Sequence, residues 1–210
     1  MLADKIIVLG VTGSIAAYKA ADIASKLTQA GAKVEVVMTE PATRFITPLA
    51  LRSITGRPVV TDIFDLDSQY TIEHIALAEA ADVVVIAPAT ASIIAKMAVG
   101  IADDMVTLTV LATKAPVIVA PAMDVNMFSN PVTQENLNKL KARGFIIIAP
   151  GYGRMASGKV GWGRLADVDK IIGTIMQVLG RSGDLAGKRL VVTAGGTQEP
   201  IDPVRHISNP

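Results

Sequence analysis

The chain has 210 residues, of which 50% are hydrophobic and 19% charged, and its formal net charge is +1. The high apolar content excludes an intrinsically disordered chain, and the absence of cysteine excludes a disulfide scaffold and fits a reducing compartment. The balanced charge offers no basic field to nucleic acid or anionic lipid, and the length suits one domain, or one domain and part of a second.

The mean hydropathy is +0.45, yet the sequence does not predict a membrane span. The longest charge-free runs, Ile6–Tyr18 and Val83–Ala95, are shorter than the ~20 residues that a spanning helix needs. The first residues, MLADKIIVLG, do not have the pattern of a signal peptide. We therefore expect a cytoplasmic protein whose apolar residues lie in strands buried on both faces, as in a parallel sheet.

Short β-branched runs alternate with helix-length segments along the chain. Strands are predicted at Lys5–Gly10, Lys33–Met38, Val83–Ala87, Pro116–Ala120, Phe145–Ala149 and Arg189–Thr193. Helices are predicted at Ser14–Ala30, Ile72–Ala80, Ser92–Gly100, Asp104–Thr113, Thr133–Arg143 and Asp167–Gly180. This alternation predicts an α/β fold with a doubly wound, mostly parallel sheet.

A change of composition near the end predicts a domain boundary. Residues 181–187, RSGDLAG, are polar and glycine-rich and are expected to link a first domain, residues 1–180, to a second one. Residues 188–210 contain a predicted strand and a glycine turn but no helix to cover them. We expect this segment to be the truncated start of a second α/β domain.

Ligands of doubly wound sheets bind beyond the carboxyl ends of the strands, so the loops there are candidate site segments. Gly10–Ser14 leads directly into a predicted helix, and its free backbone N–H groups suit a phosphate, although an ordinary tight turn would read the same way. Ala87–Ser92, APATAS, has small residues and hydroxyls that would admit a planar ligand. The alternative is that Ser92 simply caps the next helix.

Two further loops are unusual. Ala120–Phe128 is apolar for a strand end, which predicts cover by a ligand or by another subunit. Gly151–Arg164, GYGRMASGKVGWGR, is long and glycine-rich, which favours a mobile lid over the alternative of an ordinary surface loop.

His74 lies near the start of a predicted helix and is a candidate base near neutral pH, with a purely structural histidine as the alternative. A metal site is not expected, since the chain has no cysteine and no second histidine at ligand spacing.

In combination, these segments resemble the flavin-dependent cysteine decarboxylases. The matching motifs are GVTGSIAAYKA at 10–20, the His74 region, APATAS at 87–92, KMAVGIADD at 96–104, PAMDVNM at 121–127 and GKVGWGRL at 158–165. Residues 188–209 resemble the start of the ligase domain that follows in bifunctional members of the family. The resemblance implies a flavodoxin-like or Rossmann-like three-layer flavoprotein, with residues 1–180 as an FMN-binding decarboxylase domain.

The resemblance implies FMN as the cofactor, with its phosphate on the turn at Gly13 and its ring between the loops after two strands. The residues that it assigns to the cofactor are Gly13, Ser14, Ile15, Thr39, Pro88, Ala89, Thr90, Ser92, Ala122 and Met123. It also implies a homotrimer, or an assembly of trimers, with the flavin at a subunit interface.

The activity that the resemblance implies is decarboxylation of 4′-phosphopantothenoylcysteine to pantetheine 4′-phosphate in coenzyme A biosynthesis. Oxidation of the thiol-bearing carbon by the flavin would create the electron sink that loss of CO2 requires. His74 would assist proton transfer from the thiol. The residues assigned to the substrate are Asp124, Asn126, Met127 and Arg164.

The sequence departs from the family pattern at three positions. Asp124 stands where the family usually has Asn, and an ionised carboxylate there would repel the substrate carboxylate unless it is protonated by burial or assisted by a cation. Ser157 stands where many members have the lid cysteine that donates the last proton. Ser92 replaces an Asn at the end of the APATAN motif.

Two other functions stay open on the sequence alone. One is an oxidative decarboxylase that stops at the ene-thiol, like the enzymes that modify peptidyl cysteines, which Ser157 favours and the ligase-like tail disfavours. The other is a non-catalytic flavin-binding oligomeric module, which the presence of His74 opposes.

Overall fold

The computed structural model describes residues 2–63, 73–182, 188–189, 191, 198–202 and 205–208. Its main feature is one six-stranded sheet with the order β3-β2-β1-β4-β5-β6, in which every pairing is parallel. The strands are β1 (Ile6–Val11), β2 (Lys33–Met38), β3 (Val59–Val60), β4 (Val83–Ala89), β5 (Val117–Pro121) and β6 (Ile146–Ile147). This order confirms the predicted doubly wound parallel sheet, and the order reverses between β1 and β4.

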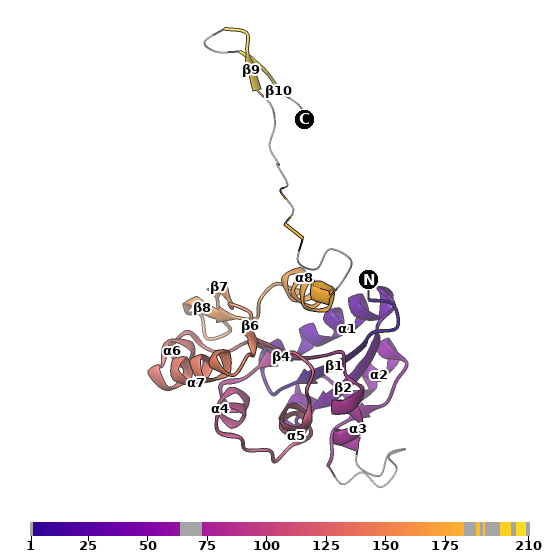
Figure 1. The fold of residues 1–210 in the computed structure, drawn as a ribbon. Helices are drawn as coiled ribbons and strands as arrows, with labels where there is room; N and C mark the ends of the chain where they lie inside the picture. Colours follow the sequence, from indigo (N-terminus) through magenta and orange to yellow (C-terminus); the bar gives the residue numbers. More distant parts are fainter. Residues whose placement is uncertain are drawn as a thin grey trace.

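Helices cover both faces of the sheet, which gives three layers (Figure 1). One face packs against α1 (Ala20–Gln29), α2 (Pro48–Thr55) and α8 (Val168–Leu179). The other packs against α3 (Glu73–Ala80), α4 (Ala91–Val99), α5 (Met105–Ala112) and α7 (Pro131–Ala142). Alternate residues of each central strand therefore enter opposite halves of the core, and all of β4 is buried.

Burial on both faces accounts for the high mean hydropathy. Ile7 and Leu9 of β1 pack into one half of the core, and Val8 between them packs into the other. Within the described part of the chain, no helix combines the length and the hydropathy that crossing a bilayer requires.

Several elements differ from the prediction. The first helix begins with a 3-10 helix, η1 (Ile15–Lys19), and the 3-10 helix η2 (Glu40–Arg44), α2, β3 and α6 (Val125–Ser129) were not predicted. A local signal for α2 was present in the sequence. The Thr47 hydroxyl accepts a hydrogen bond from the Ala50 N–H at 3.2 Å, Pro48 is the first helical residue, and Gly56 ends the helix with φ 69°.

The segment 151–164, predicted to be a mobile lid or a surface loop, forms a β-hairpin whose two strands were not predicted. Strands β7 (Gly151–Arg154) and β8 (Val160–Arg164) pair antiparallel. Glycines alternate with large residues on both strands, and this period of two is the strand signal. An added Cβ at Gly161 would lie 2.8 Å from a Val125 methyl, and one at Gly163 would collide with the Met123 carbonyl oxygen. Glycine therefore allows the hairpin to lie directly on the 123–125 segment.

The C-terminal segment contains η3 (Gly180–Ser182) and the antiparallel pair β9 (Gln198–Pro200) and β10 (His206–Ser208). Most of the strand predicted at Arg189–Thr193 and most of the linker predicted at 181–187 lie outside the described residues, and the described positions 189 and 191 are not in a strand.

Candidate functional site

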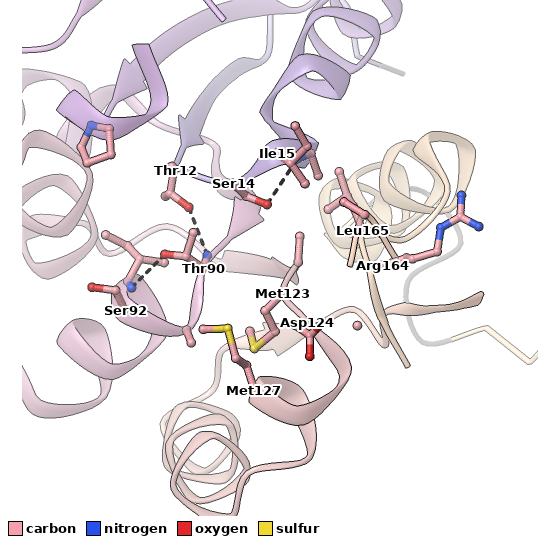
Figure 2. Close-up of a pocket in the computed structure, with 18 of the residues that line it drawn as sticks. Thr12, Ser14, Ile15, Thr90, Ser92, Met123, Asp124, Met127, Arg164 and Leu165 are labelled. Carbon is pink, nitrogen blue, oxygen red and sulfur yellow. Dashed lines mark hydrogen bonds between the residues drawn. The ribbon is translucent and has the colours of Figure 1, made fainter. Parts of the chain in front are cut away.

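A cavity of about 800 Å³ lies at the carboxyl ends of the central strands (Figure 2). Its walls come from the segments that follow β1, β2, β4 and β5, and the β7–β8 hairpin closes one side. This is the place where the strand order reverses, and ligands of doubly wound sheets bind at such a point. The volume is in the range of ordinary small-molecule sites.

Most of the residues predicted from the sequence to form a site line this cavity. They are Gly13, Ser14, Ile15, Thr39, Thr90, Ser92, Ala122, Met123, Asp124, Met127, Ser157 and Arg164. Segments far apart in the sequence are therefore brought to one place by the parallel sheet.

Four predicted residues do not line the cavity. Pro88 and Ala89 are buried in the last residues of β4, beneath the loop that does line it. Asn126 is exposed, and its backbone N–H donates to Asp124. His74 is half-buried on α3, a helix that packs mainly against α5. Its assignment to the site stays a prediction.

The turn after β1 is both a tight turn and a wall of the cavity. The Ser14 hydroxyl accepts a hydrogen bond from the Ala16 N–H at 3.2 Å and so begins η1. An added Cβ at Gly13 would lie 2.6 Å from Cβ of Pro41, so only glycine allows this turn to approach η2 so closely.

Thr12 joins two of the cavity-lining loops, and its role was not predicted from the sequence. Its buried hydroxyl donates to the Pro88 carbonyl oxygen at 2.7 Å and accepts from the Thr90 N–H at 3.1 Å (Figure 2). Thr90 in turn accepts from the Ile93 N–H at 3.2 Å, so Thr90 rather than Ser92 caps α4. Ser92 is left with its side chain on the cavity wall. No local pattern reveals the role of Thr12, because its partners lie on another strand.

Thr39, after β2, carries a buried hydroxyl oxygen that has no hydrogen-bond partner among the described residues. Thr39 lines the cavity, so a polar atom of a bound molecule could satisfy this oxygen. Buried hydroxyls are normally paired, and an unpaired one beside a cavity is the observation that best fits a missing ligand.

Asp124 is the best-connected ionisable group of the site. Its Oδ2 accepts from the Ser157 hydroxyl at 2.6 Å, its Oδ1 accepts from the Asn126 N–H at 3.1 Å, and Lys159 Nζ lies 3.6 Å from Oδ1. The Ser157 hydrogen bond, followed by the Asn126 N–H and then the charge of Lys159, holds the pKa of Asp124 below its ordinary value. Of the two possibilities raised for Asp124, this geometry favours assistance by a cation over protonation.

Cations lie on the cavity wall and at its rim. Lys96 is paired with Asp103 at 2.7 Å and Asp104 at 3.3 Å, and these partners raise the pKa of its ammonium. Within the described ranges, no acidic side chain pairs with Lys19 or Arg164, or with Arg154 of β7. These free charges suit an anionic ligand, and only Arg164 among them was predicted from the sequence.

Large apolar side chains are exposed on the hairpin and among the residues that line the cavity. Tyr152 and Trp162, opposite one another on the hairpin, form an edge-to-face pair with ring centroids 5.4 Å apart. Both rings are more than half exposed, as are the cavity-lining residues Ile15 and Tyr18. A surface of this kind is typical of an interaction face.

Comparison with known proteins gives matches over the whole chain. Residues 1–180 match the family described as Flavoprotein, and residues 185–210 match the C-terminal domain of DNA/pantothenate metabolism flavoproteins. The coenzyme A biosynthesis bifunctional protein CoaBC of Vibrio cholerae is 45% identical over 208 residues, which are 99% of this chain and 52% of the relative. That of Bacillus subtilis is 45% identical over 211 residues, covering 100% of this chain and 52% of the relative. The chain thus spans about half the length of the curated relatives it matches.

Solved structures agree with these matches. The FMN-dependent cysteine decarboxylase SpaF has a TM-score of 0.74 at 35% identity and covers 85% of this chain and 97% of its own. A mutant of PPC decarboxylase complexed with pantothenoylaminoethenethiol has a TM-score of 0.75 at 31% identity, covering 83% of this chain and 97% of its own. With a match that extends over residues 1–180 and a fold shared with these structures, the chain belongs to the flavoprotein family.

Proposed function

We propose that residues 1–180 form an FMN-dependent decarboxylase that converts 4′-phosphopantothenoylcysteine to pantetheine 4′-phosphate in coenzyme A biosynthesis. The observation that best supports the proposal is the cavity at the point where the strand order reverses. Its lining includes the Gly13 turn, Asp124 and Thr39, whose hydroxyl has no partner among the described residues. The similarity of the chain to CoaBC proteins and to PPC decarboxylase also supports the proposal.

The residues present fit FMN. The turn at Gly13 and Ser14 opens η1, and backbone N–H groups at such a turn bind phosphate well. Bound FMN would offer the Thr39 hydroxyl a hydrogen-bond partner. The loop that Thr12 holds in place would give the cofactor a cavity wall of small residues. FMN, when bound, supplies a hydride acceptor and donor for the thiol-bearing carbon of the substrate.

The chain's own side chains would then bind and enclose the substrate. Arg154, Arg164 and Lys19 offer unpaired charges for a phosphate group. Met123, Met127 and the buried Leu165 give the cavity apolar lining beside the polar group of Asp124 (Figure 2).

We further propose that the protein works as a homotrimer, or an assembly of trimers, and that His74 serves the cavity of a neighbouring subunit. Two observations support this. His74 lies outside the cavity lining of its own chain, and the lining includes the exposed apolar side chains of Ile15 and Tyr18. In that position, the imidazole would take the thiol proton of the substrate.

Residues 188–210 are proposed to open a ligase domain, with 181–187 as the linker. The match of residues 185–210 to a C-terminal flavoprotein domain supports this division.

A second candidate is an oxidative decarboxylase that releases the ene-thiol. The observation that favours it is the Ser157 hydroxyl, which is a weak acid and donates its hydrogen to the Asp124 carboxylate. A proton held in this way is a poor source for the final reduction step.

Mass spectrometry of the products after incubation with phosphopantothenoylcysteine tests both candidates. Loss of CO2 with no other change is expected for the full reaction. Loss of CO2 and of two hydrogens would identify the oxidative decarboxylase instead. Unchanged substrate from a yellow, flavin-loaded protein would contradict both.

A further inference from the structure

Three side chains meet where the β7–β8 hairpin lies on the start of α6. Ser157 and Lys159 belong to the hairpin turn, and Asp124 is the residue that caps α6. The Ser157 hydroxyl donates to Asp124 at 2.6 Å, and Lys159 Nζ lies 3.6 Å from the other carboxylate oxygen. The contact therefore gathers a carboxylate, a hydroxyl and an ammonium group at one edge of the cavity.

The Asp124 carboxylate creates an electrostatic problem for the proposed substrate. Asp124 lines the cavity, and its hydrogen bonds favour the ionised form. A ligand that carries its own carboxylate near this edge would meet a like charge in a partly enclosed space, where solvent screens poorly. Such a ligand binds more tightly when a cation offsets Asp124.

Lys159 is the cation in the right place. Among the described residues, it is the one cation recorded in an ion pair with Asp124. Lys96, on another wall of the cavity, is already paired with Asp103 and Asp104. Lys159 is about half exposed, so its ammonium can move toward an arriving carboxylate while staying close to Asp124.

We infer that Lys159 is a specificity-determining residue, which offsets the charge of Asp124 so that the cavity admits a ligand bearing a carboxylate beside the hairpin turn. This inference rests on the proposed function, because it takes the carboxylate to be that of an acyl-cysteine substrate. Lys159 acts on the carboxylated ligand and not on its decarboxylated product, which lacks the repelled group.

The test compares two ligands that differ by one carboxylate, phosphopantothenoylcysteine and pantetheine 4′-phosphate. Binding of each is followed by stopped flow, before turnover, through the visible spectrum of the flavin-loaded protein, for wild type and for Lys159→Gln. Because the Lys159–Asp124 pair is partly exposed, we expect Lys159→Gln to lower the affinity for the carboxylated ligand by about fivefold. The affinity for the product should fall by less than about twofold. Lys159→Arg keeps the charge and should behave as wild type.

The same comparison of the two ligands in an Asp124→Asn protein is the matched control. In that protein the like charge is gone, so the carboxylated ligand should bind more tightly relative to the product. Adding Lys159→Gln should return this preference to about the wild-type level, because both opposing charges are then removed. Equal weakening of both ligands by Lys159→Gln in the wild-type background would overturn the inference, since it would indicate a general effect on the hairpin. A double variant whose preference for the carboxylated ligand stays as low as that of Lys159→Gln alone would overturn it as well.

The same data separate this inference from the proposed function. A wild-type protein that carries flavin but binds neither ligand contradicts the proposed function and, with it, the role of Lys159. A wild-type protein that binds and decarboxylates the substrate, with Lys159→Gln unchanged toward both ligands, contradicts only the role of Lys159.

Discussion

At the scale of single residues, the site is defined by polar groups whose partners are unusual. Thr12 uses its hydroxyl to join two loops, whereas Thr39 keeps its hydroxyl unpaired on the cavity wall. The first arrangement fixes the shape of the cavity, and the second leaves a group ready for a ligand. Loss of the hydroxyl is therefore expected to destabilise the protein at position 12 but not at position 39.

Replacing Thr39 by Val tests the second arrangement. Valine has nearly the same shape but no hydroxyl, so the apo protein should be as stable as wild type or more stable, because an unpaired buried polar atom is removed. FMN affinity should fall by about tenfold, corresponding to roughly 1–1.5 kcal/mol for one lost hydrogen bond. Thermal unfolding of the apo protein and flavin titration measure the two effects.

Thr28 on α1 offers a matched control. Its buried hydroxyl oxygen is also unpaired among the described residues, but Thr28 does not line the cavity. Thr28→Val should leave FMN affinity unchanged. A Thr39→Val protein that binds FMN as tightly as wild type would remove Thr39 from the cofactor site.

At the scale of elements, the β7–β8 hairpin is the part that was least predictable from the sequence. Its glycines were interpreted as flexibility, whereas they provide a flat face that contacts Met123 and Val125. The backbone N–H of Met123 donates to the Gly163 carbonyl oxygen at 2.9 Å, which attaches the hairpin to the loop after β5. Close approach of two backbones, rather than mobility, explains the composition.

Gly163→Ala should therefore displace the hairpin. Its Cβ would collide with the Met123 carbonyl oxygen, and the φ of 143° is unfavourable for any residue with a Cβ. We expect a loss of about 1–3 kcal/mol in the free energy of unfolding, and faster proteolysis between residues 151 and 164. Chemical denaturation and timed digestion measure these changes.

Gly173, in α8, has no atom within 4 Å of an added Cβ. Gly173→Ala should stabilise the protein by about 0.5–1 kcal/mol, because alanine favours the helix. If both substitutions changed stability in the same direction, close backbone contact would not be the reason for glycine at position 163.

At the scale of the whole molecule, His74 is not among the residues that line the cavity of its own subunit. The cavity is at the strand ends, and His74 is on α3, which packs mainly against α5. If the proposed trimer places His74 of one subunit against the cavity of the next, neither part is complete in a single chain.

Subunit mixing tests this arrangement. His74→Asn and Gly13→Val are each expected to be inactive, the first through the base and the second through collision of its side chain with Pro41. Refolding the two together should restore activity to about one site in four by random assortment, since only some subunit interfaces combine an intact cavity with an intact histidine. A mixture as inactive as its components would show that His74 serves its own chain or has no catalytic role.

How much could be predicted from the sequence differs between these scales. The order of the main strands and helices was predictable, because apolar runs and capping residues are local signals. Most of the predicted site residues do line the cavity, since the carboxyl ends of parallel strands share one edge. The hairpin was not predictable, because its alternating pattern was hidden by glycine, and Thr12 was not, because its partners are loops from β4.

The sequence by itself determined the class of fold, the family and the loops that form the site, because each of these depends on residue types and their spacing. Only the tertiary structure decided which groups meet. It pairs Asp124 with Ser157 and Lys159, leaves the Thr39 hydroxyl without a partner among the described residues, and does not include His74 in the lining of the cavity. The physical reason is that hydrogen bonds and ion pairs form over a few ångströms, and the assembled sheet and helices set those distances.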